Sequence, residues 1–216
     1  MYSKILLALK PGSDCSGLLR TASALAVRFN AGIVVCHVST SPGRWNGCAL
    51  NLLPDDHIRE LSTRIEREFR PNMSRVKQCY FLTLTGIPHV EILRLARRIQ
   101  PDLIMMGSWR DPKRLQRTSG TLEQVGRNAQ CPVMVVEEPF DELNFTKILA
   151  ATDFSPAAGN AVDYAAQLAE LSAAHLQLFH AMDETAHSPA DIQKATDFAG
   201  RLYGHILKRQ ARITVQ

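Results

Sequence analysis

The sequence predicts an α/β fold built on an open, parallel, five-stranded sheet flanked by helices. Two apolar runs, 103–106 and 133–136, are short and uninterrupted, which is typical of strands buried on both faces of a parallel sheet. Near the start of the chain, the apolar runs 5–9 and 33–38 enclose a segment, 15–29, whose apolar residues recur at helical spacing. This order predicts a βαβ unit with parallel strands and a right-handed crossover.

The first strand, 5–9, is followed by a turn rich in helix breakers and then by the helix 15–29. The apolar stripe of this helix consists of Leu18, Ala22, Leu25 and Phe29. We expect Asn30-Ala31-Gly32 to end the helix with a left-handed residue before the second strand, 33–38.

After a long loop, Asp55 or Asp56 is expected to cap a charged helix that runs to Phe69, and 79–84 is the third strand. The turn Gly86-Ile87-Pro88 then opens a helix over 89–99. Its apolar residues at successive turns include Val90 and Leu93. The strand 103–106, the helix 122–128 and the strand 133–136 complete five strands and four helices.

The chain then repeats its own beginning. Residues 146–153 align with residues 3–10 at a constant spacing of 143 residues, and the alignment holds without a gap as far as His37 and His180. A repeat of this length indicates a duplicated domain. The second copy continues through a helical stretch, 191–208, to a third strand at 212–215. The sequence therefore predicts a complete domain at 1–140 and a partial second copy at 141–216.

Composition excludes several classes of protein. The chain has 216 residues, 45% of them hydrophobic, and no apolar run that approaches the ~20 residues of a membrane-spanning helix. Its five cysteines form no C-x-x-C pair, which favours reduced thiols in the cytoplasm over disulfides or a zinc site. The net charge of +4 comes from basic residues scattered over helices. We therefore expect neither a membrane nor a nucleic acid as a partner.

A glycine-flanked basic loop follows the strand 103–106. Gly107 opens the loop, and Gly120-Thr121 closes it at the start of a helix, where unpaired N–H groups and the helix dipole favour an anion. The basic residues of this loop are Arg110, Lys113, Arg114 and Arg117. An ordinary solvated crossover is the alternative interpretation.

In register, these features resemble the universal stress protein family, UspA-like, over residues 3–138 and, as a partial second copy, over 146–216. The family's phosphate loop reads G-x2-G-x9-G-S/T. The residues that carry the resemblance are Gly86, Pro88, Gly107, Gly120, Thr121, Cys131, Pro132 and Val133. The resemblance implies an adenine-nucleotide α-hydrolase-like fold with strand order 3-2-1-4-5. It also implies that ATP or AMP is the ligand, bound weakly if at all, with any need for Mg²⁺ open.

Two nucleotide-contact positions depart from the family pattern. Arg110 stands where the loop has its second glycine, and it could either block a triphosphate or supply a charge that binds one. Lys10 stands where the family's nucleotide binders usually place an aspartate near the base and ribose. The second copy keeps that acid as Asp153 but has no phosphate loop. Asp153 could instead cap the helix that begins near Pro156.

The resemblance implies a cytoplasmic stress-response protein that acts through dimerisation. A nucleotide-hydrolysing enzyme and a purely structural dimerisation module are the alternatives. The enzyme is disfavoured because no acid–base pair or carboxylate cluster accompanies the loop. No catalytic or metal-binding residue is predicted, since His37 and His180 lack neighbours at ligand spacing. We expect a homodimer through the last strand, at Val133 and Val135, or pairing with the tandem domain.

Overall fold

The structure is a computed structural model that describes residues 2–11, 15–40, 55–108, 120–137 and 145–181, together with single helical positions between 190 and 204. The chain divides into two compact units, Met1–Glu142 and Leu143–Gln216, which are described separately below. The predicted third strand of the second copy, 212–215, and the loop residue Arg110 lie outside the described residues.

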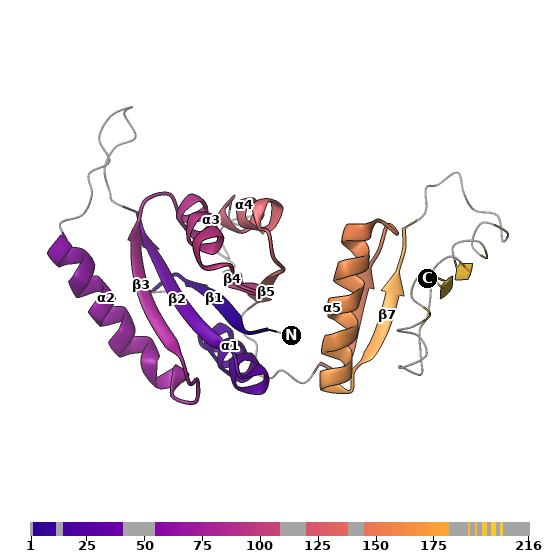
Figure 1. Ribbon diagram of the computed structural model, residues 1–216, viewed down its shortest axis with the longest axis horizontal. Coiled ribbons are helices and arrows are strands. Elements are labelled where there is room, and N and C mark those ends of the chain that lie inside the picture. Colours follow the sequence, from indigo (N-terminus) through magenta and orange to yellow (C-terminus); the bar gives the residue numbers. More distant parts are fainter. Residues whose placement is uncertain are drawn as a thin grey trace, which may run out of the picture. The chain divides into compact units, whose positions relative to one another are not determined.

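The first unit is an open, fully parallel sheet with the strand order β3-β2-β1-β4-β5, as predicted (Figure 1). The strands are β1 (Lys4–Leu9), β2 (Gly32–Ser39), β3 (Cys79–Thr85), β4 (Leu103–Ser108) and β5 (Val133–Glu137). The helices are α1 (Ser16–Phe29), α2 (Asp55–Phe69), α3 (Pro88–Ile99) and α4 (Gly120–Asn128), with a short 3-10 helix at Arg70–Met73.

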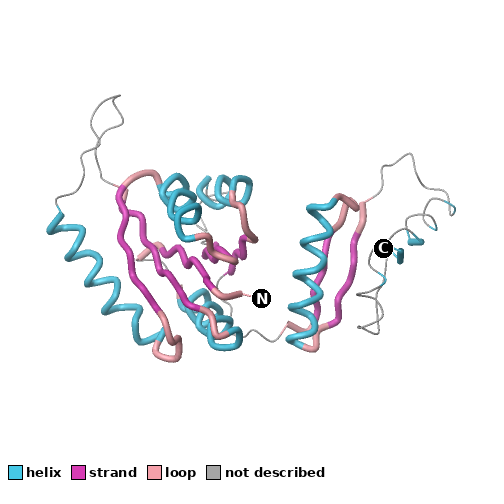
Figure 2. Tube along the Cα trace, viewed as in Figure 1, coloured by secondary structure: helices cyan, strands magenta, loops and turns pink. Residues whose placement is uncertain are grey.

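Helices cover both faces of this sheet (Figure 2). On one face, Leu6 and Ile104 pack with residues of α3 and α4, including Ile92 and Val125, in one buried cluster. The neighbouring residue Leu7 points to the other face and is also fully buried. Successive side chains of a strand alternate between faces, so the uninterrupted apolar run of β1 is explained by burial on both sides.

The turns that end and begin the helices follow the sequence chemistry. Asn30 adopts a left-handed conformation with φ 53° after α1, and its N–H donates to carbonyls of that helix. Gly86 before α3 has φ 142°, and a Cβ there would lie 3.0 Å from Glu91 Cγ, so only glycine fits without strain. Of the apolar residues at successive turns of α3, Val90 is 37% exposed, while Ile92, Leu93, Leu95 and Ala96 form the buried face.

The second unit repeats the βαβ beginning of the first. Strands β6 (Lys147–Ala151) and β7 (His175–Phe179) are parallel neighbours, joined by α5 (Pro156–Ser172). Their shared core contains Ala150, Val162, Ala169, Leu176 and Leu178. The helix ends at Ala173 with φ 51°, as α1 ends at Asn30.

The start of α5 corrects one interpretation of Asp153. The helix cap is Ser155, whose Oγ accepts from the N–H of Ala158 at 3.2 Å. Asp153 lies two residues before this cap, and its Oδ1 accepts a hydrogen bond from the N–H of Ser155 at 2.9 Å. It therefore closes the turn that leads into the helix rather than capping the helix itself.

Candidate functional site

A cavity of about 500 Å³ opens at the carboxyl ends of β1, β2 and β4 in the first unit. The starts of α1, α3 and α4 contribute its remaining described walls. The crossover from β1 leads to β2 on one side, and β4 lies on the other side of β1, so the strand order reverses here. Ligands of open α/β sheets bind in the crevice at such a reversal.

The structure brings three of the sequence-predicted site residues to this cavity: Lys10, Gly107 and Thr121. Lys10 follows the end of β1 and is exposed, and Gly107 lies at the end of β4. Thr121 is the second residue of α4 and is half-buried. A helix start that faces a cavity with a hydroxyl and backbone N–H groups can receive a phosphate.

Packing among the described residues does not require the two glycines of the loop. A Cβ on Gly107 would meet Leu18 Cδ2 at an ordinary 3.5 Å, and a Cβ on Gly120 would meet nothing within 4 Å. Gly107 lines the cavity, and its role as a glycine of a phosphate loop stays a prediction. Arg110 and the other residues of 109–119 lie outside the described residues, so both interpretations of Arg110 stand.

His37 lines the cavity at the end of β2, a position that the sequence alone did not connect with the site. Its Nδ1 lies 3.1 Å from the carbonyl oxygen of Leu9. A carbonyl only accepts, so Nδ1 carries the hydrogen of this bond. Burial lowers the pKa of His37; the bond to Leu9 opposes this change, and Arg64 reinforces it. The imidazole is therefore neutral at pH 7, and the bond holds the end of β2 against the end of β1.

Two of the cysteines contribute sulfur to the lining of the cavity. The Sγ of Cys15, just before α1, donates to the carbonyl oxygen of Lys10 at 3.6 Å. Burial raises the pKa of Cys36 to about 12, so this residue remains a neutral thiol. Both side chains are buried, and they supply apolar surface rather than a nucleophile.

The second unit preserves the histidine bond but reverses the charge beside it. His180 Nδ1 lies 2.8 Å from the carbonyl oxygen of Thr152, at the same spacing of 28 residues as His37 and Leu9. Asp153 follows β6 and is exposed. Hydrogen bonds from the side chain and the N–H of Ser155 lower the pKa of Asp153, so it is ionised at pH 7. The position equivalent to Lys10 therefore carries a negative charge.

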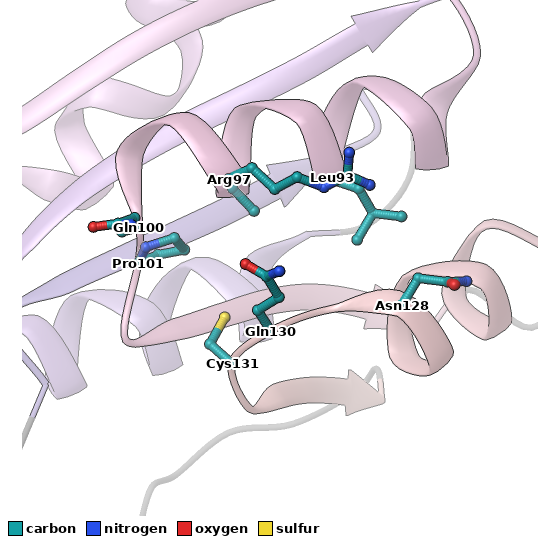
Figure 3. Close-up of a pocket in the computed structure, with 8 residues that line it drawn as sticks. Leu93, Arg97, Gln100, Pro101, Asn128, Gln130 and Cys131 are labelled. Carbon is teal, nitrogen blue, oxygen red and sulfur yellow. The ribbon is translucent and has the colours of Figure 1, made fainter.

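A second, smaller cavity of about 200 Å³ lies between the ends of α3 and α4 (Figure 3). Its lining includes Arg97 of α3 together with Gln130 and Cys131, which precede β5. Burial raises the pKa of the Cys131 thiol. This cavity lies at the amino ends of β4 and β5, whereas Lys10, Gly107 and Thr121 lie at the carboxyl ends of the strands. None of the predicted site residues lines it.

The described residues contain no group of three or more His, Cys, Asp or Glu side chains that could hold a metal ion. No helix in the described ranges is long and apolar enough to cross a membrane.

Comparison with known proteins identifies relatives of both units. The model of the universal stress protein family matches residues 1–137 and 144–211. A search of curated proteins finds no match. Among solved structures, a universal stress protein from Archaeoglobus fulgidus is 20% identical, with a TM-score of 0.70, and the match covers 99% of this chain and 75% of that one. UspA from Lactobacillus plantarum is also 20% identical, with a TM-score of 0.51, over 62% of this chain and 97% of its own. At this identity, both likenesses show the fold.

Proposed function

The chain belongs to the universal stress protein family, and from this membership we propose that its first unit binds an adenine nucleotide, ATP or AMP, in the cavity at the ends of β1, β2 and β4. The observation that carries the proposal is the meeting of Lys10, Gly107 and Thr121 in one cavity of about 500 Å³. A volume of this size is typical of sites for small ligands.

The two ends of the cavity suit the two parts of a nucleotide. At one end, the start of α4 offers N–H groups and the Thr121 hydroxyl to a phosphate. The lining also has apolar side chains, with Val38 at the end of β2, Ile92 of α3 and Met106 of β4. A purine can stack on such a surface while backbone groups at the end of β2 hydrogen-bond its edge.

We further propose that binding is weak and serves regulation rather than turnover, in a cytoplasmic stress-response protein that acts through dimerisation. The family's phosphate loop has glycine where this chain has Arg110, which supports weak binding. The edge position of β5 supports a dimer, because its described pairing is to β4 alone and Val135 is 49% exposed.

Equilibrium dialysis of the full chain with labelled ATP and labelled AMP, with and without Mg²⁺, tests the proposed ligand. Thr121→Val removes one phosphate hydrogen bond, and we expect binding to weaken about tenfold. Thr63→Val is the matched control, since Thr63 is exposed on α2 and its hydroxyl donates to Arg59 of the same helix. Saturable binding that Thr121→Val leaves unchanged would contradict the placement of the phosphate, and no binding at all would contradict the proposed function.

A further inference from the structure

The charge at the position of Lys10 differs between the two copies of the βαβ unit. The unit β1–α1–β2 and its repeat β6–α5–β7 share the same parallel pairing and the same histidine–carbonyl bond. At the equivalent position after the first strand of each, however, one copy has Lys10 and the other has Asp153, both exposed. The same local backbone thus accepts either charge, and the βαβ fold by itself does not dictate a lysine at this position.

Among the described residues that line the cavity, Lys10 is the one with a charged side chain. The other polar side chains in the lining are hydroxyls, thiols and the imidazole of His37. Burial is the main reason that the pKa of His37 is lowered, and the imidazole is therefore neutral at pH 7. The ammonium of Lys10 and the start of α4 are thus two separate positive features that face one cavity.

The order of the strands places Lys10 between the two ends of a bound nucleotide. The sheet runs β2-β1-β4, so the end of β1 lies between the end of β2 and the end of β4. The phosphate site belongs to α4 on the β4 side, and the apolar surface formed by Val38 and Ile92 lies on the β2 side. With the phosphate and the base at these two places, the sugar lies over the end of β1, where Lys10 stands.

A lysine and an aspartate read a sugar differently. A carboxylate accepts hydrogen bonds from free ribose hydroxyls, whereas an ammonium has three donors and no acceptor. Dinucleotide-binding folds use the same distinction, with an acid on the free 2′-hydroxyl and a basic residue where that hydroxyl is phosphorylated. An ammonium over the sugar therefore favours a phosphate on the sugar.

We propose that the cavity of the first unit selects a nucleotide that is phosphorylated on its ribose as well as at its 5′ position, and that Lys10 contacts the ribose phosphate. The inference rests on the proposed function, because it requires an adenine nucleotide in the cavity with its 5′-phosphate at α4. It adds the ligand class and names the residue that sets specificity.

Isothermal titration of the full chain tests the inference with four ligands: AMP, ADP, adenosine 3′,5′-bisphosphate and adenosine 2′,5′-bisphosphate. We expect one of the two ribose phosphates to bind about tenfold more tightly than AMP, as one charge-assisted contact allows. Lys10→Gln should bring the affinity of that ligand close to the affinity of AMP, and Lys10→Asp should make AMP the tighter ligand. The second phosphate of ADP lies on the 5′-phosphate chain, away from the sugar hydroxyls. Both variants should therefore keep the parent chain's ratio between the affinities for ADP and AMP.

Lys77→Asp is the matched control, because it makes the same change of charge at an exposed residue. Lys77 lies just before the amino end of β3, whereas the cavity lies at the carboxyl ends of the strands. It should leave every ligand ratio as in the parent chain. If AMP binds and both bisphosphates bind no more tightly, the inference is overturned while the proposed function stands. If Lys10→Asp weakens ADP as much as the bisphosphates, Lys10 reads the phosphate chain and the inference is again overturned. If no nucleotide binds, both fail together.

Discussion

Asp102 joins the start of β1 to the turn before β4 through a single carboxylate oxygen. Its Oδ2 accepts hydrogen bonds from the N–H and the hydroxyl of Ser3, both at 2.7 Å, and from the N–H of Lys4 at 2.8 Å. Burial by itself raises the pKa of Asp102, but the hydrogen bonds from Ser3 and Lys4 outweigh it, and the pKa lies below its ordinary value of 3.8. The carboxylate form thus stabilises the folded state.

Asp102→Asn should lower the free energy of unfolding at pH 7 by about 1 kcal/mol, a figure that allows for solvent around this partly exposed group. Because the pKa is lowered on folding, the stabilisation is present above the unfolded value of 3.8 and is lost as the pH falls through the lower folded value. Urea unfolding of both chains should therefore show a difference at pH 7 that shrinks below pH 3.8. A difference that is constant with pH would rule out the carboxylate as its source.

Arg110 stands where the family's phosphate loop has glycine, and one of its two interpretations is that a large side chain here keeps the loop backbone away from a phosphate. Arg110→Gly should therefore tighten ATP binding, by roughly tenfold if one crowded contact is relieved. Arg117→Gly, in the same loop but outside the glycine positions, is the control. Weaker binding by Arg110→Gly in the dialysis experiment would show that the arginine is itself a phosphate ligand.

At the scale of elements, we expect a charge on one edge strand of the first sheet to affect assembly and a charge on the other edge strand to have no effect. β5 ends the sheet beyond β4, and Val135 on it is 49% exposed, an apolar edge that favours pairing with another strand. Val135→Lys should shift the chain from dimer to monomer in light scattering, because a charge at this edge opposes pairing. Tyr80→Lys places the same charge on the other edge strand, β3, where Tyr80 is 61% exposed, and should leave the mass unchanged. An unchanged mass for Val135→Lys would contradict a dimer through β5.

At the scale of the whole molecule, the two units differ in how well their sheets are covered. Leu6 of β1 is 0% exposed beneath α3 and α4, whereas Leu149, its counterpart at a spacing of 143 residues, is 64% exposed. Phe179 of β7 is 41% exposed. Among the described residues, one face of β6–β7 thus leaves Leu149 and Phe179 in solvent, and these two side chains contribute little burial to offset the loss of conformational entropy.

We therefore expect the second unit to unfold more readily than the first. Limited proteolysis should cut between Glu137 and Thr146 and then degrade the C-terminal piece faster than the N-terminal one, as gel electrophoresis with mass spectrometry would show. The second unit should not bind nucleotide without the first, since Asp153 has no phosphate loop beside it in the sequence. An isolated fragment 141–216 that folds cooperatively as a monomer, or binds ATP, would refute this expectation.

Local patterns were sufficient to predict most of the fold. The strands β1, β2, β4 and β5 followed from uninterrupted apolar runs, and α1 followed from its periodic apolar face and its left-handed end at Asn30. Patterns failed where burial depends on a distant partner. The face that α3 turns to the sheet excludes Val90, and this depends on how the helix is rotated against the strands. Similarly, Ser155 rather than Asp153 caps α5, because the turn at Asp153 shifts the helix start.

The sequence by itself determined the duplication, the family and the parallel sheet, because each of these depends on residue type at fixed spacing along the chain. The phosphate end of the candidate site stays a prediction from the same kind of spacing. The tertiary structure alone decided which residues share the cavity. His37, Thr121 and Ile92 come from three separate elements and Lys10 from the turn after β1, and they meet because the strand order reverses at β1. It also decided that Leu6 is covered while Leu149 is exposed, although both lie in matching apolar runs. Burial depends on what packs across a strand, and spacing within the strand carries no information about that partner.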